Sequence, residues 1–546
     1  MSPFVKKGKG ILCMGIYLNP GNEGFWNAVR SKIYIDKTRL IAYTNELINT
    51  EQRFICVSRP RRFGKSMTLK MLAAYYSCGC NSKELFEGRN IEGENSFLEH
   101  LNQYDVIFLN MQQFLIRARS QNVTDYLERV VISEIRETYG ALFSEKETIL
   151  AVVLEQIFVK TGKKFIFLID EWDCVMREQQ ESEALQKQYL DFLRDLLKDQ
   201  SYAALAYMTG ILPVKKYGEH SALNMFWEYS MTDQKVLQEY TGFTEKEVKS
   251  LCECFGMDFA ETSSWYDGYK FPEYQHVYNP RSVVEAMSCH KFSNYWASTE
   301  VYDALKIYMD MDFDGLRADI VRMLGGGHVK INTRSFRNDM RNFKTKDDVL
   351  TLLVHLGYLA YDSETREAFI PNKEIIEEFE NAMSVGGWSE VMRVVMESEK
   401  LLEDTLACNE ESVAEGLDRA HMEISSILTY NDENSLGCAI GLAYYSARKD
   451  YMLIRELPTG HGFADVVFLP LPHTGKPALV IELKYEKTAA AAIQQIKDRK
   501  YTKTLENYTG EILLVGINYD KNCADKPHRC VIERIKKNAV QNCNNQ

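Results

Sequence analysis

A Gly-Lys-Ser triplet between a short apolar run and a helical pattern is the feature that most constrains the fold of this chain. The stretch 57–72 reads VSRPRRFGKSMTLKML, in which Gly64, Lys65 and Ser66 follow the β-rich run FICVSRP and precede the helically spaced run MTLKMLAAYYS. Backbone N–H groups and the dipole of a helix N-terminus favour an anion at such a strand-to-helix turn. The sequence therefore predicts a phosphate-binding loop.

The loop departs from the general pattern G-x-x-x-x-G-K-[ST], because Arg59 stands where the first glycine is expected. That glycine permits a tight turn with unusual backbone angles, which Arg adopts less freely. The backbone amides expected nearest the β-phosphate belong to Arg62, Phe63 and Gly64, so ATP binding should survive with altered loop geometry. Three interpretations of the arginines 59, 61 and 62 stay open: positive charge near the anion, an exposed basic face that binds nothing specific, and contacts to nucleic acid.

Polar residues follow the ends of two further apolar runs. KKFIFLIDEWD contains Asp170 and Glu171, and YAALAYMTGI contains Thr209 near its end. We expect Lys65 to reach the β- and γ-phosphates of ATP and the Ser66 hydroxyl to hold Mg²⁺. Asp170 should contact Mg²⁺ through water, Glu171 should orient the attacking water, and Thr209 should sense the γ-phosphate.

Strand-like and helical patterns alternate in this part of the chain. The strand-like runs are 54–60, 104–111, 163–173 and 202–211, and a helical stretch lies near 123–137. This order predicts a parallel sheet with crossover helices, whose ligands bind at the carboxyl ends of the strands. The expected polar site residues lie at those ends.

Several strings in this region resemble the bacterial AAA-ATPase-like family. They are YIDKT (34–38), RPRRFGKS, LIDEWD, TGILPVKKYGEHSALN (209–224), WYDGYKF (265–271) and VYNPRSVV (277–284). The resemblance covers residues 14–380 and implies a P-loop ATPase. Arg59 is the usual residue in that family, so it departs only from the general pattern.

The segment 347–372 reads as an amphipathic helix followed by strand, turn and strand, which is the outline of a winged helix. A winged helix can bind DNA, but no basic recognition helix stands out here. We therefore favour a structural lid on the ATPase core over a DNA-binding module.

A second group of polar residues lies on two strand-like runs near the C-terminus, GFADVVFLP and KPALVIELKYEK. Glu482 and Lys484 are two residues apart and so share one face of a strand, and Asp465 on the preceding strand can reach the same point. Two carboxylates there can hold Mg²⁺ or Mn²⁺, and Lys484 can orient water or stabilise charge in phosphodiester hydrolysis. The alternative is a surface hairpin with alternating charges, against which the flanking apolar runs VVF and ALVI argue.

With Glu433 and Gln495 added, this set resembles the PD-(D/E)xK nuclease superfamily. The resemblance implies that Asp465 and Glu482 bind the metal and that Lys484 serves catalysis. It also implies that Glu433 supports the water shell of the metal, and that Gln495 orients the substrate or the active-site lysine.

Composition limits the class of protein. The chain has 546 residues, 45% of them hydrophobic, and a net charge of -12, so a polyanion site must be a local basic patch. No run approaches the roughly 18 apolar residues that span a bilayer, and we expect no membrane partner.

The thirteen cysteines show no metal spacing and read as reduced thiols, which predicts a cytoplasmic protein. Met14 is an alternative start.

The expected fold class is α/β: a P-loop NTPase parallel sheet with a helical and winged-helix lid, followed by a mixed α/β domain like that of restriction endonucleases. The expected domains are a P-loop domain (1–235), the lid (236–380), a helical, acid-rich connector (381–424) and a nuclease-like domain (425–546).

These patterns predict an ATP-binding and ATP-hydrolysing bacterial protein whose C-terminal domain cleaves nucleic acid with a metal ion, ATP gating the nuclease. The resemblance to the nuclease superfamily, whose members usually act on DNA, favours DNA over RNA as the substrate. The alternative is an ATP-dependent signalling switch whose C-terminal domain binds nucleic acid or protein without cleavage. Further partners left open are a second copy of the chain and a regulatory protein.

Overall fold

The computed structural model divides the chain into two compact units, each built from several segments. The first unit contains Met1–Ser250, Tyr269–Val284 and Asn332–Glu364, and the second contains Leu251–Gly268, Glu285–Ile331 and Thr365–Gln546. The segment expected as the lid contributes to both units, and the domain boundaries remain predictions. The described residues are 15–214, 223–233, 235–296, 302–311, 313, 315–336, 343–384, 388–424, 433–459, 462–471, 474–485, 488–498, 508, 510–520 and 528–535.

The first unit is built on a five-stranded sheet with the strand order β2-β3-β4-β1-β5, and its strand pairs are parallel. Four of the strands coincide with the apolar runs expected from the sequence, whereas β5 is only three residues long and was not predicted. The strands are β1 (Phe54–Ser58), β2 (Asp105–Asn110), β3 (Phe165–Asp170), β4 (Ala203–Gly210) and β5 (Trp227–Tyr229).

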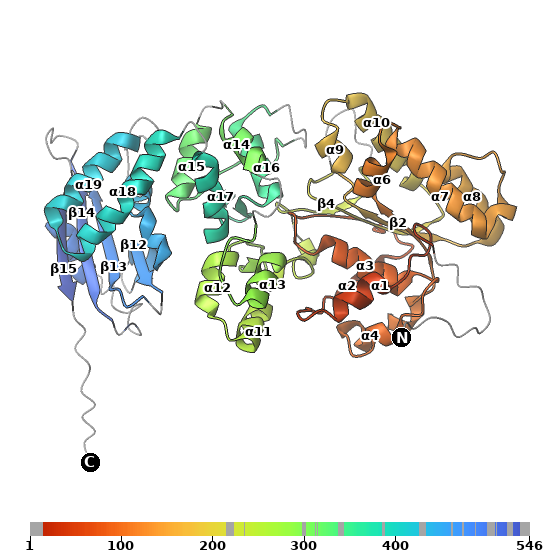
Figure 1. Cartoon of the computed structure of the whole chain (residues 1–546), viewed down its shortest axis with the longest axis horizontal. Coiled ribbons are helices and arrows are strands. Elements are labelled where there is room, and N and C mark those ends of the chain that lie inside the picture. The colour runs from red at the N-terminus through yellow and green to blue at the C-terminus, as the bar shows by residue number, and fades with distance from the viewer. Residues whose placement is uncertain are drawn as a thin grey trace, which may run out of the picture. The chain divides into compact units, whose positions relative to one another are not determined.

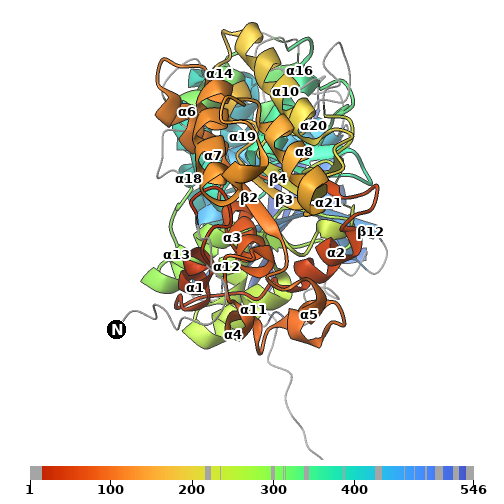
Figure 2. The same ribbon diagram turned by 90° about the vertical axis from the view of Figure 1, so that its right-hand side faces the viewer.

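Helices cover both faces of this sheet (Figures 1 and 2), as a parallel sheet requires. One layer contains α6 (Met111–Ala118), α7 (Val123–Tyr139), α8 (Leu150–Thr161), α9 (Cys174–Glu178) and α10 (Glu183–Leu197). The other contains α1 (Glu23–Val29), α2 (Arg39–Leu47), α3 (Lys65–Tyr76), α4 (Lys83–Phe86) and α5 (Phe97–His100).

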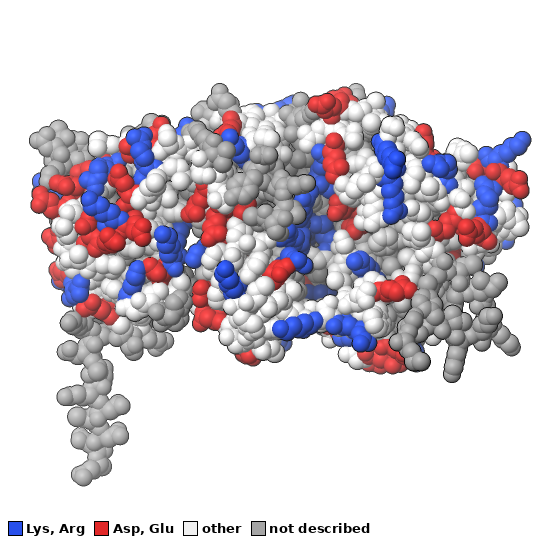
Figure 3. Space-filling view, in the orientation of Figure 1, with Lys and Arg blue, Asp and Glu red and all other residues white. Residues whose placement is uncertain are grey.

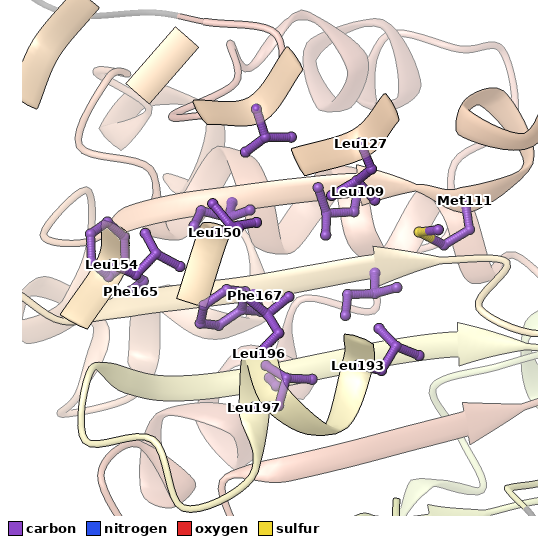
Figure 4. Close-up of a cluster of buried hydrophobic side chains, with 14 of the residues drawn as sticks. Leu109, Met111, Leu127, Leu150, Leu154, Phe165, Phe167, Leu193, Leu196 and Leu197 are labelled. Atoms are coloured by element: carbon purple, nitrogen blue, oxygen red, sulfur yellow. The ribbon is translucent and has the colours of Figure 1, made fainter. Parts of the chain in front are cut away.

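Two buried apolar clusters, one on each face, hold the sheet between the helix layers. Figure 4 shows one of them, in which Phe165 and Phe167 on β3 lie among leucines of α7, α8 and α10. Because β3 and β4 are buried along their whole length, their sequences are continuous apolar runs rather than alternating ones. Because the apolar residues of these strands are held in the core, the polar residues that end the strands lie at the edge of the sheet.

The next part of the chain is mainly helical, as expected. Its helices are α11 (Glu245–Phe255), α12 (Phe259–Tyr266), α13 (Pro280–Cys289), α14 (Tyr302–Met309), α15 (Leu316–Leu324), α16 (Lys346–Leu356) and α17 (Lys373–Ser384). Its short strands are β6 (Phe243–Thr244), β7 (Val277–Tyr278), β8 (Val329–Lys330), β9 (Ala360–Asp362) and β10 (Glu367–Phe369). The order α16, β9, β10 follows the predicted helix, strand, turn and strand, and the assignment as a winged helix stays a prediction.

The second unit contains a mixed five-stranded sheet with the order β11-β12-β13-β14-β15. Only β13 and β14 pair in parallel, and the other neighbouring strands are antiparallel. The strands are β11 (Tyr451–Thr459), β12 (Gly462–Pro470), β13 (Ala478–Tyr485), β14 (Ile512–Tyr519) and β15 (His528–Ile535).

Helices α18 (Ser389–Leu406) and α19 (Glu410–Ile424) come from the expected acid-rich connector and belong to this second unit. Their acidic residues are interspersed with basic ones (Figure 3), and two ion pairs join the helices, Arg393 with Glu423 and Arg419 with Glu397. The remaining helices are α20 (Glu433–Ala443) and α21 (Ala489–Asp498). No helix in the described ranges is long and apolar enough to cross a membrane.

Candidate functional site

The predicted phosphate-binding loop joins β1 to α3 in the structure. Gly64 is the N-cap of α3 with φ of 87°, and Arg62 also has a positive φ, of 71°. Arg59 is not among the residues with positive φ. The loop therefore makes its left-handed turns at Arg62 and Gly64, and it does not require a glycine at position 59.

Arg59 is fully buried. Its Nε donates to Thr241 Oγ1 at 2.9 Å, its Nη1 donates to the carbonyl oxygen of Tyr229 at 2.9 Å, and its guanidinium lies 5.1 Å from the ring centroid of Phe271. Burial lowers the pKa of Arg59 to about 10. The interpretation of Arg59 as part of an exposed basic face was wrong, whereas Arg61 is exposed.

We expect Arg59→Ala to destabilise the first unit by about 2–4 kcal/mol, because it leaves a cavity and removes the buried donors to Thr241 and Tyr229. The matched control is Arg61→Ala, an exposed site where a change within about 0.5 kcal/mol is expected. Urea unfolding of both variants and of the wild type measures the difference. Equal unfolding midpoints for the two variants would contradict the structural role of Arg59.

Lys65 opens α3 and is buried. Its Nζ donates to the carbonyl oxygens of Arg59 and Pro60 at 2.8 and 2.7 Å. Burial lowers the pKa of Lys65 to about 8, and the nearby carboxylates oppose that shift. The ammonium thus lies inside the loop, and Ser66 follows it as an exposed residue of the first turn of α3.

The acids after β3 lie beside the end of β4. The registers pair Ile169 with Met208, so the following residues Asp170 and Thr209 are neighbours. Asp170 is buried, and its Oδ1 accepts hydrogen bonds from Thr209 Oγ1 at 2.7 Å and from the backbone N–H of Glu171 at 3.1 Å. The structure thus brings Asp170 and Thr209 together at the carboxyl edge of the sheet, next to β1.

Two residues near this edge were not singled out from the sequence. Asp173 is fully buried, and its Oδ2 accepts hydrogen bonds from Arg177 Nε at 3.0 Å and from the backbone N–H of Leu212 at 2.9 Å. Arg177 also donates to Glu171 Oε2 at 3.1 Å. Asp173 therefore ties the loop after β3 to the segment after β4, and Arg177 positions Glu171. The string DEWD ends in a third acidic residue, Asp173, and this acid was the one sign in the sequence that Asp173 belongs to the site.

The site fits a magnesium–nucleotide. The amides at the start of α3 and the Lys65 ammonium can bind phosphate oxygens. The Ser66 hydroxyl and the Asp170 carboxylate are oxygen ligands of the kind that Mg²⁺ prefers. Glu171 has a side chain that is 38% exposed and a backbone φ of 51°, so its carboxylate is accessible beside the buried Asp170.

The second predicted group lies on β13 and α21. Glu482 is fully buried, and its Oε1 accepts a hydrogen bond from Lys484 Nζ at 2.9 Å and another from Gln495 Nε2. Lys484 Nζ also donates to the carbonyl oxygen of Leu483 at 3.0 Å. The structure therefore unites Glu482, Lys484 and Gln495, and the surface-hairpin alternative is wrong for β13, because both of its charged residues are buried.

The structure describes the backbone of Asp465 in β12 and of Glu433 in α20. The side chains of these two residues lie outside the described part of the structure. The antiparallel register pairs Val466 with Ile481. Continued by one residue, this register sets the backbone of Asp465 opposite that of Glu482. The backbone therefore agrees with the expectation that the two residues meet.

The residues at β13 fit a divalent cation only in part. The buried Glu482 carboxylate is an oxygen ligand of the kind that a hard cation takes, whereas Lys484 and Gln495 both donate to its Oε1. Within the described residues no group of three or more His, Cys, Asp or Glu side chains could hold a metal ion. Glu482 is thus the one predicted ligand of this site whose side chain is described.

Two segments match family models. Residues 27–218 match the family described as "Predicted AAA-ATPase", and residues 434–526 match the PD-(D/E)XK nuclease superfamily. Both matches confirm the resemblances expected from the sequence.

One curated relative, "Uncharacterized protein in vnfD 5'region" of Azotobacter chroococcum mcd 1, is 25% identical over 275 residues, which are 49% of this chain and 50% of the relative. The chain thus matches about half the length of that relative.

Among solved structures, the chain is similar to the Walker-type ATPase PABY2304 of Pyrococcus abyssi, with 12% identity, a TM-score of 0.32, and coverage of 63% of this chain and 94% of that one. It is also similar to the ORC2 protein of Aeropyrum pernix, with 12% identity, a TM-score of 0.29, and coverage of 65% and 97%. The two family matches thus place a segment that resembles the predicted AAA-ATPase family before a segment that resembles the PD-(D/E)XK nuclease superfamily.

Proposed function

We propose that this protein binds and hydrolyses ATP with Mg²⁺ at the loop before α3, and that it cleaves phosphodiester bonds of nucleic acid at β13 with Mg²⁺ or Mn²⁺. The observation that carries the nuclease part is the buried pair Glu482 and Lys484 on one face of β13, to which the half-buried Gln495 of α21 is hydrogen-bonded. A buried, mutually bonded acid and base are costly to keep in a protein core, which supports a functional role.

At the ATP site, the amides that begin α3 and the Lys65 ammonium would bind the phosphates, and Ser66 and Asp170 would hold the magnesium ion. Asp170 is itself oriented by the hydroxyl of Thr209, and the proposal gives Thr209 the role of sensing the γ-phosphate. Glu171 orients the attacking water and takes up its proton, and Arg177 holds the Glu171 carboxylate in place.

At the nuclease site, Asp465 and Glu482 would hold the metal ion, which when bound polarises the phosphodiester and lowers the pKa of a water. Lys484 stabilises the negative charge that develops on the phosphate in the transition state. Gln495 orients Glu482 from α21. Glu433 is proposed to hold the water shell of the metal.

ATP is proposed to gate the cleavage, and DNA is the favoured substrate. The gate is tested by comparing cleavage in the presence of ATP, of ADP and of a non-hydrolysable ATP analogue. If only ATP supports cleavage, the gate requires ATP hydrolysis. If the non-hydrolysable analogue supports cleavage as well, ATP binding is sufficient. Equal cleavage with and without any nucleotide would contradict gating.

Glu171→Gln should abolish ATP turnover while it retains ATP binding. The amide keeps the shape of the carboxylate but is a much weaker base, so we expect a loss of about 10²-fold or more in kcat. Glu183→Gln, an exposed acid in the first turn of α10, is the matched control. Phosphate release and nucleotide affinity are measured for both variants, and turnover unchanged by Glu171→Gln would disprove the role of Glu171.

A further inference from the structure

Asn518 on β14 lies beside the lysine of the nuclease site. The parallel register pairs Glu482 with Gly516 and Lys484 with Asn518. A Cβ atom on Gly516 would lie 2.5 Å from the carbonyl oxygen of Ala489, so this face of the sheet is the one that α21 covers. Because residues two apart share a face of a strand, Asn518 lies on the same face as Lys484 and next to it.

The side chain of Asn518 has an acceptor without a donor. Asn518 is 6% exposed, and its buried Oδ1 accepts no hydrogen bond within the described part of the chain. Buried amide oxygens are normally hydrogen-bonded, because a buried acceptor without a donor loses its bonds to water and gains none in return. An unmatched acceptor in a site of this kind therefore indicates a donor that arrives in another state of the site.

The neighbouring ammonium can supply that donor. A lysine ammonium has three N–H groups, and among the described residues the Lys484 ammonium donates to Glu482 Oε1 and to the carbonyl oxygen of Leu483. Glu482 Oε1 also accepts from Gln495. A divalent cation at Glu482 would compete with Lys484 for that oxygen and would repel its positive charge.

We propose that Asn518 Oδ1 is the acceptor that holds the Lys484 ammonium when a divalent cation occupies Glu482. In that state the Lys484 ammonium keeps its hydrogen bond to the carbonyl oxygen of Leu483 and donates to Asn518 Oδ1 in place of Glu482 Oε1. The Glu482 carboxylate is then available as a ligand of the divalent cation, and the ammonium stays beside the site. Asn518 is thus a positioning residue, and this inference rests on the proposed nuclease function.

Two substitutions of Asn518 separate this role from a structural one. Asn518→Leu has nearly the same shape and lacks the acceptor, whereas Asn518→Asp keeps it. Manganese binding to the full chain without nucleotide is measured by calorimetry, and the heat that Glu482→Gln abolishes identifies this site. Cleavage kinetics and the melting temperature in EDTA are measured on the same proteins.

For Asn518→Leu we expect Mn²⁺ affinity and kcat to fall about tenfold each, with little change in the KM for nucleic acid, because a hydrogen bond to a charged group is lost. Its melting temperature in EDTA should equal or exceed that of the wild type, because an unmatched buried polar group is removed. Asn518→Asp should stay within about threefold of the wild type in Mn²⁺ affinity and kcat.

Unchanged Mn²⁺ affinity in Asn518→Leu would overturn the proposal. A loss of affinity in both variants together with lower melting temperatures would overturn it in favour of a structural role. If the wild type binds Mn²⁺ at Glu482 but cuts no nucleic acid, the nuclease function fails while the calorimetric comparison still decides the role of Asn518. A wild type that binds no Mn²⁺ at this site overturns both.

Discussion

Lys65→Ala should weaken ATP binding by about 50- to 100-fold, because the ammonium supplies charge-assisted hydrogen bonds to the phosphates that alanine cannot replace. The ammonium is already inside the loop, held by the carbonyl oxygens of Arg59 and Pro60, so it needs only a small movement to meet a phosphate. Affinity is measured by calorimetry with ATP and Mg²⁺.

The control for this variant is Lys70→Ala, an exposed lysine of the same helix α3, which should leave the affinity unchanged. The melting temperature of Lys65→Ala without nucleotide shows whether the loss of a buried side chain disturbs the fold. Unaltered ATP binding in a folded Lys65→Ala protein would refute the assignment of the phosphate-binding loop.

The affinity for ATP should also depend on pH in a defined direction. Burial lowers the pKa of Lys65 to about 8, so the lysine of the free protein loses its proton as the pH rises through 8. Bound phosphate favours the protonated form, so ATP binding takes up a proton above pH 8 and weakens from pH 7 to pH 9. Calorimetry in buffers of different ionisation enthalpy measures this uptake, which should be absent in Lys65→Ala.

Lys484→Ala should lower nucleic-acid cleavage by about 10²- to 10³-fold, which is the usual effect of removing one preorganised group that stabilises transition-state charge. The substitution also removes the ammonium that pairs with the buried Glu482 carboxylate. The folded state of the variant must therefore be checked by its melting temperature. Lys400→Ala, an exposed lysine of α18, is the control and should cut at the wild-type rate. Wild-type cleavage by Lys484→Ala would exclude Lys484 from catalysis.

The four long strands of the first sheet could be predicted because they are buried on both faces and therefore appear as continuous apolar runs. The strand β5 could not, since three residues with one of them exposed leave no readable pattern. The strand β15 was also missed, because its sequence HRCVIERI carries four basic or acidic residues among its apolar ones.

The partners of Arg59 could not be predicted from the local sequence. The string RPRR shows three arginines that look alike, yet Arg59 is buried and Arg61 is exposed. The difference comes from Tyr229 and Thr241, which lie about 170 to 180 residues further along the chain and accept hydrogen bonds from Arg59. Contacts at such separations follow from tertiary packing.

The polar residues at the strand ends were predictable in position but less so in pairing. The sequence pointed to Asp170 and Thr209 separately, and only the register of β3 with β4 shows that they share a hydrogen bond. The same holds for Asn518, which stands in no motif and becomes notable only when β14 is set beside β13. Strand order is a tertiary property that spacing within one strand does not reveal.

The most direct test of the ATP-gated nuclease is a cleavage assay of plasmid, linear duplex, single-stranded DNA and RNA with Mg²⁺ or Mn²⁺, with and without ATP. The wild type, Lys65→Ala and Lys484→Ala are compared on every substrate. We predict metal-dependent cutting by the wild type that requires ATP, needs a higher ATP concentration in Lys65→Ala, and falls by about 10²- to 10³-fold in Lys484→Ala. Intact substrates under every condition would contradict the nuclease function, and equal cutting by Lys484→Ala would contradict its assignment to the site at β13.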